Sequence, residues 1–511
     1  MNNVSAFGWR KDKESYSSGL DFLGLAVPIE RILDRWTPGM TNATNRVRFF
    51  SFIPWIVHQY AIQGRQGSLS EQRVFIRAFE TFFALANAAN EYETGISARG
   101  GIRMRYARKK WKGGKNKIAI RGPSVPSSPS AFDPANYGPS FSRFHLIGKN
   151  GRLRTCLEPG IVMAEVFSES VPGIAKMKSL FSGESISRSQ VLDFHKSLNL
   201  HRIPRKELNH LRKLVFAERP FDFGDTLNRV RTLLLLLSVI SGSKQPLAAF
   251  EIESVIAGGR YSTRRRLKVP ACLEQAYARW RIITMLKFLR HSAEIAFKGL
   301  HIHIGETNEW FRIAGDAAAK VAQMAAGEIR ANSFENLVAD DLSNYQLPKW
   351  EIDEHDNDAV DKVCSGVSLL SWCAARIQEE QMKPLLEDSA GRIGDQLNAG
   401  LSSYAWELKQ AESLSVENLI RWLLIDRGLA RHNRVAAKKL WQHNTFRVVD
   451  DEHGAISVGQ CPIPNIAVRV GSMLSTLADL KILQSENRSY SLTAEGSRYF
   501  DQQMKSLIAD Q

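Results

Sequence analysis

The stretch at residues 466–496, IAVRVGSMLSTLADLKILQSENRSYSLTAEG, does most to decide how this chain folds. Its first half carries apolar residues at helical spacing, namely Val470, Met473, Leu474, Leu477 and Leu480. This spacing predicts an amphipathic helix over residues 466–480. The sequences KIL from residue 481 and YSL from residue 490 then flank the polar tip Ser-Glu-Asn-Arg-Ser, which predicts two short strands joined by a turn.

This order of helix, strand, polar tip and strand resembles a winged helix-turn-helix. The resemblance covers residues 416–505 and is moderately specific from residue 466 onward. In winged helices that bind DNA, the helix before the wing enters the major groove. The resemblance therefore implies DNA contacts by the outward side of that helix and by the wing tip: Arg469, Ser472, Ser475, Thr476 and Arg488. Asp479 on the same side argues slightly against phosphate contact, and a winged helix that docks a protein is the alternative.

Helical patterns fill most of the remaining chain. Ser68 and Glu71 have the S-x-x-E spacing of a capping box, and a helical apolar pattern follows them. Other helical patterns cover residues 160–335, with a long amphipathic helix at 271–300, and residues 363–442. We therefore predict a mainly α, multidomain helical protein with a C-terminal winged helix-turn-helix that adds a small β-wing.

The length of 511 residues exceeds what one hydrophobic core usually serves, so we expect about two to four domains. Changes in composition divide the chain into six parts. They are an N-terminal helical domain (1–95), a basic loop or hairpin with a Pro- and Ser-rich linker (96–160), a central helical domain (161–334), an acidic linker (335–362), a helical segment (363–415) and a winged-helix domain (416–511).

The composition is that of a folded protein, with 44% apolar and 24% charged residues, which excludes a disordered or collagen-like chain. Five cysteines without a C-x-x-C pair argue against a disulfide framework or a zinc ribbon. The N-terminus lacks the apolar core of a signal peptide. The most apolar run, at residues 233–240, is far shorter than the roughly 20 residues of a membrane span. We expect a cytoplasmic protein without membrane contact and without a cofactor.

Residues 99–121 are strongly basic within a chain of net charge +15. This run contains no acid and ten basic residues: Arg99, Arg103, Arg105, Arg108, Lys109, Lys110, Lys112, Lys115, Lys117 and Arg121. We interpret it as an exposed loop or hairpin that follows a phosphate backbone, with Tyr106 and Trp111 stacking on bases. Such a density of like charge is repulsive unless a ligand neutralises it, which favours this interpretation over a solvated, flexible loop.

Three further clusters bear on chemistry. Arg264, Arg265 and Arg266 form a second, weaker candidate for nucleic-acid contact. His301 and His303, expected on one side of a strand near Glu306, have a spacing that binds metals, but ordinary half-buried histidines explain them better. The acids at 353–361 are better explained as a solvated linker than as a nuclease site. We find neither a P-loop nor a nucleophile elbow in the sequence.

Two N-terminal blocks are distinctive: WTPGMT at residues 36–41 and NRVRFFSFIPWI at 45–56, with YGPSFSRF following at 137–144. They resemble a family of large uncharacterised bacterial proteins, often encoded in antiphage defence gene clusters, whose opening block reads PG-T…R-R-Y-F-F-x-P-W-I. Phe50 stands where that family has Tyr. The resemblance implies a bacterial protein that acts with neighbouring gene products on foreign DNA. Physically, the apolar FFSFIPWI run indicates a buried helix or strand.

These observations lead to one leading hypothesis and two alternatives. The leading hypothesis is a non-catalytic nucleic-acid-binding subunit of a multi-protein bacterial antiphage defence system, with double-stranded DNA as its expected ligand. The first alternative is an interaction scaffold whose winged helix docks an ATPase or nuclease subunit. The second is an unrecognised metal-dependent nuclease. Phosphate contacts do not separate DNA from RNA.

Overall fold

The structure is a computed structural model that describes residues 23, 26–42, 45–63, 67–98, 100–127, 129–133, 136–222, 226–307, 309–343, 358–379, 382, 401–440, 444–463 and 468–509. The described chain is mainly helical, as predicted, and its sheets have two or three short strands.

Packing contacts divide the chain into two compact units. Unit 1 draws on the described residues of Met1–Glu30, Ala257–Arg266 and Arg281–Ile466, and unit 2 on those of Arg31–Ile256, Leu267–Trp280 and Ala467–Gln511. Their borders do not coincide with the borders predicted from composition. A change in composition marks an exposed polar stretch, whereas the border of a unit depends on which distant segments pack together.

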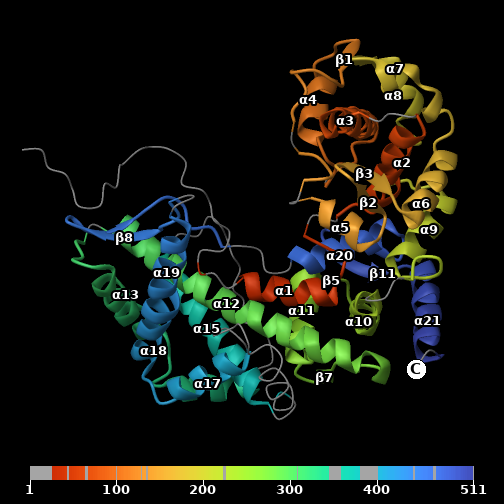
Figure 1. The fold of residues 1–511 in the computed structure, drawn as a ribbon. Helices are drawn as coiled ribbons and strands as arrows, with labels where there is room; N and C mark the ends of the chain where they lie inside the picture. The colour runs from red at the N-terminus through yellow and green to blue at the C-terminus, as the bar shows by residue number, and fades with distance from the viewer. Residues whose placement is uncertain are drawn as a thin grey trace, which may run out of the picture. The chain divides into compact units, whose positions relative to one another are not determined.

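The core of unit 2 forms around three helices: α2 (Phe49–Ile62), α3 (Leu69–Thr94) and α6 (Glu158–Ser170) (Figure 1). The FFSFIPWI run lies within α2. Phe52 and Trp55 are fully buried, and their rings lie 5.4 and 5.3 Å from the ring of Phe167 on α6. The expectation of a buried helix or strand is thus met by a core helix.

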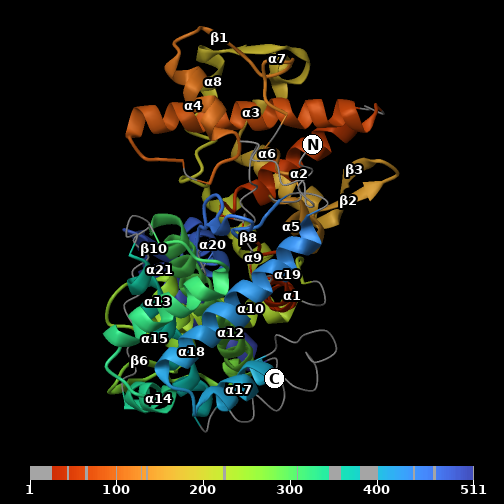
Figure 2. The ribbon, with the colours of Figure 1, turned by 90° about the vertical axis from the view of Figure 1, so that its left-hand side faces the viewer.

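Helix α3 supports one end of unit 2. It begins at the predicted capping box, which is confirmed because Ser68 and Glu71 exchange hydrogen bonds of 3.3 and 2.8 Å. Figures 1 and 2 show further elements gathered at α3: α4 (Met104–Lys112), α7 (Lys178–Ser182), α8 (Arg188–Phe194), and the sheet of β1 (Lys117–Ala119) with β4 (Ser185–Ser187).

The predicted helix and the two predicted strands after it are present in unit 2 as α20 (Val468–Asp479), β10 (Leu483–Glu486) and β11 (Ser489–Leu492). A third strand, β5 (Leu247–Ala248), pairs with β11 from a position more than 200 residues earlier in the chain. Helix α10 (Leu227–Gly242) packs on β11 and on α21 (Ala494–Ala509), and α11 (Ala249–Gly258) follows β5 directly. This three-stranded sheet therefore joins two distant segments of the chain.

Unit 2 also contains several shorter elements: α5 (Gly138–Arg143), the hairpin of β2 (Ile147–Asn150) and β3 (Leu153–Cys156), η1 (Ile174–Lys176), α9 (Arg205–Val215) and η3 (Ala271–Leu273). Helices α1 (Ala26–Trp36) and α12 (Glu274–Glu306), like α11, contribute residues to both units.

Unit 1 is a group of helices with two hairpins, and Figure 2 shows α13, α15 and α18 together. Its helices are α13 (Ala314–Glu328), α14 (Phe334–Ser343), α15 (Ala359–Gln378), α17 (Leu401–Ala411), α18 (Val416–Trp422), the π-helical η5 (Leu423–Leu429) and α19 (Ala430–Lys439). Its hairpins are β6 (Arg260–Ser262) with β7 (Arg265–Arg266) and β8 (Val448–Asp451) with β9 (Gly454–Ser457). The predicted 416–511 domain is thus divided, since its residues before 467 belong to this unit.

The predicted acidic linker at 335–362 is helical at both described ends. Helix α14 covers all of residues 335–343, and α15 begins at Ala359 with the Asp358 carboxylate accepting a hydrogen bond from the Asp361 amide. Residues 344–357 lie outside the described residues. Across the described part of the chain, no helix combines the length and apolar character that crossing a membrane requires.

Candidate nucleic-acid interface

The middle of the basic run is a helix, so the prediction of a loop or hairpin there was wrong. Met104, Ala107 and Trp111 recur at helical spacing, and all three are buried in α4, which packs on α3. The guanidinium of Arg188 lies over the Trp111 ring at 4.4 Å. Trp111 is therefore a core residue and is not placed to stack on bases. The apolar spacing was visible in the sequence, but the surrounding charge obscured it.

Two of the ten basic residues hold the fold instead of facing solvent. Arg103 is buried, lies 3.2 Å from Glu80 and donates to the Pro126 carbonyl at 2.7 Å. Burial raises the pKa of Glu80, although the charge of Arg103 opposes that shift. Arg121 donates to the carbonyls of Leu180 and Gly183. Both predictions of phosphate contact are corrected, because these guanidinium groups are used by protein carbonyls and a carboxylate.

Seven of the ten form what we call the basic face: Arg105, Arg108, Lys109, Lys110, Lys112, Lys115 and Lys117. All are exposed except Lys110, which is half-buried with its ammonium 5.5 Å from the Tyr106 ring. Arg108 forms an ion pair of 2.8 Å with Glu91, and the other six form none with any described residue. Arg99 lies outside the described residues.

The aromatic residues near the basic face differ from the predicted pair. Tyr106 is half-buried and donates to the Ala119 carbonyl at 3.1 Å, and burial raises its pKa. Tyr92, which sequence reasoning missed, is 80% exposed and directly follows the partner of Arg108 on α3. Nothing in the local pattern distinguishes Tyr92 from the core aromatics of the same helix, because its exposure depends on what packs around α3.

Helix α20 does not present its polar side to solvent, contrary to the prediction from the winged-helix resemblance. Arg469 donates to Asp34 at 2.9 Å and to Thr37 at 3.2 Å. Ser472 donates to the Asn45 side chain at 2.6 Å, and Asp479 lies 3.2 Å from Arg46. Thr476 is fully buried and Ser475 is half-buried. The polar side of α20 is thus an internal surface of unit 2, matched by polar groups of residues 34–47.

Of the remaining predicted contacts, three are exposed and one is half-buried. Arg488 at the tip between β10 and β11 is exposed, with a positive φ of 65°. Arg264 and Arg266 are exposed on the β6–β7 hairpin, while Arg265 is half-buried over the Tyr261 ring at 4.9 Å. That hairpin belongs to unit 1 and the basic face to unit 2.

The histidine pair is not arranged for a metal. His301 and His303 lie in α12 and not in a strand. Side chains two positions apart in an α-helix point to different sides of it, so the two imidazoles do not face the same way. Burial lowers the pKa of both imidazoles. Among the residues that the structure describes, no group of three or more His, Cys, Asp or Glu side chains is arranged to hold a metal ion.

All five cysteines are free thiols, in agreement with the absence of a disulfide framework. Burial raises the pKa of Cys156 and of Cys461 to about 12. Comparison of the chain with family models, with curated proteins and with solved structures gave no match.

Proposed function

We propose that this chain binds nucleic acid without catalysing a reaction on it, and that it holds double-stranded DNA by its phosphate backbone. The observation that carries the proposal is the division of α4 into two sides. One side buries Met104, Ala107 and Trp111, and the other carries five residues of the basic face, Arg105, Arg108, Lys109, Lys110 and Lys112. Lys115 lies between α4 and β1, and Lys117 begins β1. Because the buried side anchors the helix, the five charges on α4 are held in a fixed arrangement.

The charge of the basic face supports a polyanionic ligand. Six of its seven residues have no ionic partner among the described residues, and the run that contains them has no acid. A duplex that neutralised these charges would release counterions, with a salt slope of about −0.9 for each phosphate contact. Seven contacts correspond to a slope of about −6.

The proposed binding is independent of sequence. Contacts to phosphates position a protein on DNA, whereas contacts to base edges specify the site. The helix expected to read bases, α20, has its polar side occupied by Asp34, Thr37 and Arg46 of the same unit. We therefore assign affinity to the basic face, and we assign no reading of base edges in a groove to α20.

Fluorescence anisotropy with labelled duplex DNA, single-stranded DNA and RNA over a salt series tests this proposal. The variant Lys109→Glu/Lys112→Glu should weaken duplex binding and make the salt slope shallower by about 1.8, since it removes two contacts. The matched control is Arg498→Glu/Lys505→Glu, which makes the same change of charge at exposed positions of α21. Equal losses in both variants, or unchanged binding by the first, would overturn the proposal.

A second candidate function is a protein-docking scaffold, favoured by the packing of α20. We infer that α10, β5 and α11, together with α20, β10 and β11, make up a winged helix divided between two distant segments. The pairing of β11 with β5 supports this inference. A winged helix with its groove-reading side occupied is suited to a structural or docking role. In the defence system that the N-terminal resemblance implies, an ATPase or nuclease subunit is the expected partner, and co-purification without DNA affinity in the isolated chain tests it.

A further inference from the structure

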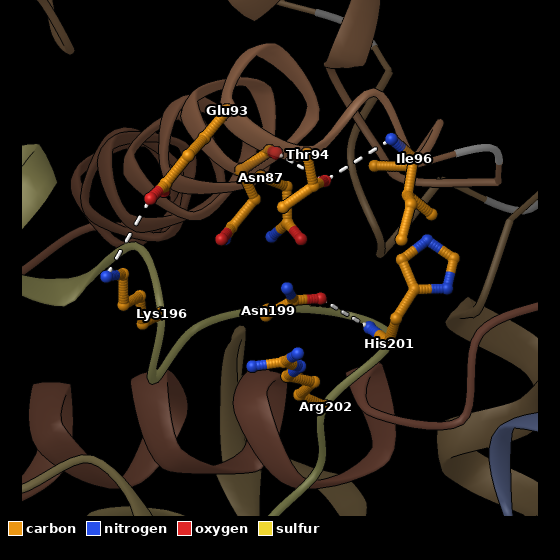
Figure 3. A pocket seen from close by; sticks show the side chains of 10 residues that line it. Asn87, Glu93, Thr94, Ile96, Lys196, Asn199, His201 and Arg202 are labelled. Carbon is orange, nitrogen blue, oxygen red and sulfur yellow. Dashed lines mark hydrogen bonds and ion pairs between the residues drawn. The ribbon is translucent and has the colours of Figure 1, made fainter.

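A cavity of about 240 Å³ lies in unit 2 between the C-terminal half of α3 and the chain at residues 195–202 (Figure 3). Pockets for drug-sized ligands begin at roughly 300 Å³. This cavity is therefore of a size for a single planar ring system. We call it the asparagine pocket, because Asn87, Asn90 and Asn199 line it.

Asn87 fixes the shape of the asparagine pocket. Its amide nitrogen donates to the carbonyls of Phe83 at 2.9 Å and Leu198 at 3.0 Å, and its oxygen accepts from the Leu200 amide at 2.9 Å. These bonds attach the 195–202 segment to α3. Asn87 thus joins the two walls of the pocket and uses both N–H groups of its amide within the protein.

The other two asparagines have unused hydrogen-bonding atoms. The Asn90 amide nitrogen donates to the carbonyls of Ala86 and His195, which fixes its orientation, while its oxygen accepts no hydrogen bond from a described residue. The Asn199 oxygen accepts from the His201 amide at 2.7 Å, and its nitrogen donates to no described residue. Figure 3 shows that nitrogen turned toward the α3 side of the cavity.

Both side chains are more than nine-tenths buried, with exposures of 6% for Asn90 and 9% for Asn199. Neither unused atom is among the fully buried polar atoms of the described residues that lack a partner, so both are open to the cavity, where a ligand that enters it can contact them. The pocket offers one acceptor and one donor. This pair is complementary to the edge of a heterocycle that carries both an N–H group and an acceptor atom, as nucleobases do.

The remaining walls fit the rest of a nucleotide. Ile96 and Ala98 provide apolar surface for the face of a ring. Lys196 and Arg202 are exposed cations at the same cavity, and Arg202 forms no ion pair with any described residue. Lys196 lies 3.7 Å from Glu93. An uncompensated guanidinium beside an apolar slot is suited to a phosphate joined to a planar base.

The asparagine pocket and the basic face share the segment at residues 96–98. Arg108 of the basic face donates to the Ser97 hydroxyl at 3.4 Å, and the His201 ring at the pocket lies 3.1 Å from the Ser97 carbonyl. Ile96 and Ala98, on either side of Ser97, line the pocket. A strand held on the basic face would therefore pass close to the pocket.

From these observations we propose that the asparagine pocket binds the base of a nucleotide, with Asn90 and Asn199 contacting the base edge and Arg202 the phosphate. The nucleotide is either a free mononucleotide or one residue of a bound strand. If the nucleotide is a residue of a bound strand, the inference rests on the proposed function. If it is a free mononucleotide, the inference does not depend on that function.

Calorimetric titration of the full chain with AMP, CMP, GMP and UMP tests the free form. The variant Asn199→Asp keeps the oxygen that accepts from His201 but removes the donor, and should weaken binding at least tenfold. Arg202→Ala should weaken binding of the nucleotide and leave binding of the matching nucleoside unchanged. Arg205→Ala, an exposed arginine outside the pocket, is the matched control. Thermal melting establishes that each variant is folded.

A duplex containing 2-aminopurine at one unpaired position tests the strand form, because its fluorescence changes when the base leaves the stack. A change that Asn199→Asp abolishes, with duplex affinity intact, supports a strand base in the pocket. Nucleotide binding without that change supports a free nucleotide. If the chain binds duplex DNA but shows neither nucleotide binding nor the fluorescence change, the pocket proposal is overturned and the proposed function stands. The effect of Lys109→Glu/Lys112→Glu on duplex binding tests the basic face separately.

Discussion

The ion pair between Arg48 and Glu207 gives the sharpest prediction about stability. Both side chains are fully buried, and two hydrogen bonds of 3.2 and 3.0 Å join the guanidinium to the carboxylate. Ser51 donates to the same carboxylate at 2.6 Å, and Arg48 donates to the Asn199 carbonyl at 2.7 Å. The change Glu207→Gln keeps the volume but leaves the Arg48 charge buried without a counter-charge.

Removing one partner of a buried pair costs about 3–5 kcal/mol. Unfolding entropy is about 2.1 cal/mol/K per residue, so for a unit of roughly 280 residues this loss lowers the Tm by about 5–8 °C. The control is Glu169→Gln, which breaks the exposed pair with Lys206 and should cost about 0–1 kcal/mol.

Differential scanning calorimetry of both variants, with the unit 2 transition followed separately, gives the comparison. A third variant, Arg48→Met/Glu207→Leu, removes both charges and should recover most of the loss, because no unpaired charge is then left inside. Equal Tm values for Glu207→Gln and Glu169→Gln would refute the reasoning, since they would mean that water reaches the pair.

Three further predictions follow from the same packing. Trp111→Ala should destabilise unit 2 by about 3–5 kcal/mol in urea denaturation, and a loss below about 1 kcal/mol would contradict its burial. Burial, and then the charge of Arg46, lowers the pKa of His201, so the free energy of unfolding should decline as pH falls below about 6.5, the pKa of histidine in the unfolded chain. His201→Gln should make that decline shallower, and identical pH profiles of the two proteins would count against this prediction. Cys156 and Cys461, with thiol pKa values of about 12, should resist iodoacetamide at pH 8 until the chain is unfolded, and rapid labelling of the native protein would disprove this.

Local patterns in the sequence predict much of the helical architecture. The capping box at Ser68, the FFSFIPWI helix and the helix with its wing all depend on residues a few positions apart, so their spacing alone indicates them. The same principle applies to α4, whose apolar spacing was present but was outweighed by the charge around it.

Long-range packing accounts for what the sequence did not predict. A polar side on an amphipathic helix is normally read as solvent-facing, but Asp34, Asn45 and Arg46 supply partners for α20 from more than 400 residues earlier. The same limit applies to the asparagine pocket, because neither Asn90 nor Asn199 is distinctive until α3 and the 195–202 segment lie together.

The use of residues 468–509 in unit 2 has a consequence for synthesis on the ribosome. Chains generally fold domain by domain as they emerge, N-terminal parts first. The described part of unit 2 starts early in the chain, yet Thr37, Arg46 and strand β5 each have a partner that is made only after residue 467: Arg469, Asp479 and strand β11. Residues 281–466, which belong to unit 1, are translated in between. During that time the first part of unit 2 lacks these three partners. The nascent chain therefore completes unit 2 after residues 281–466 of unit 1, although most of unit 2 precedes them.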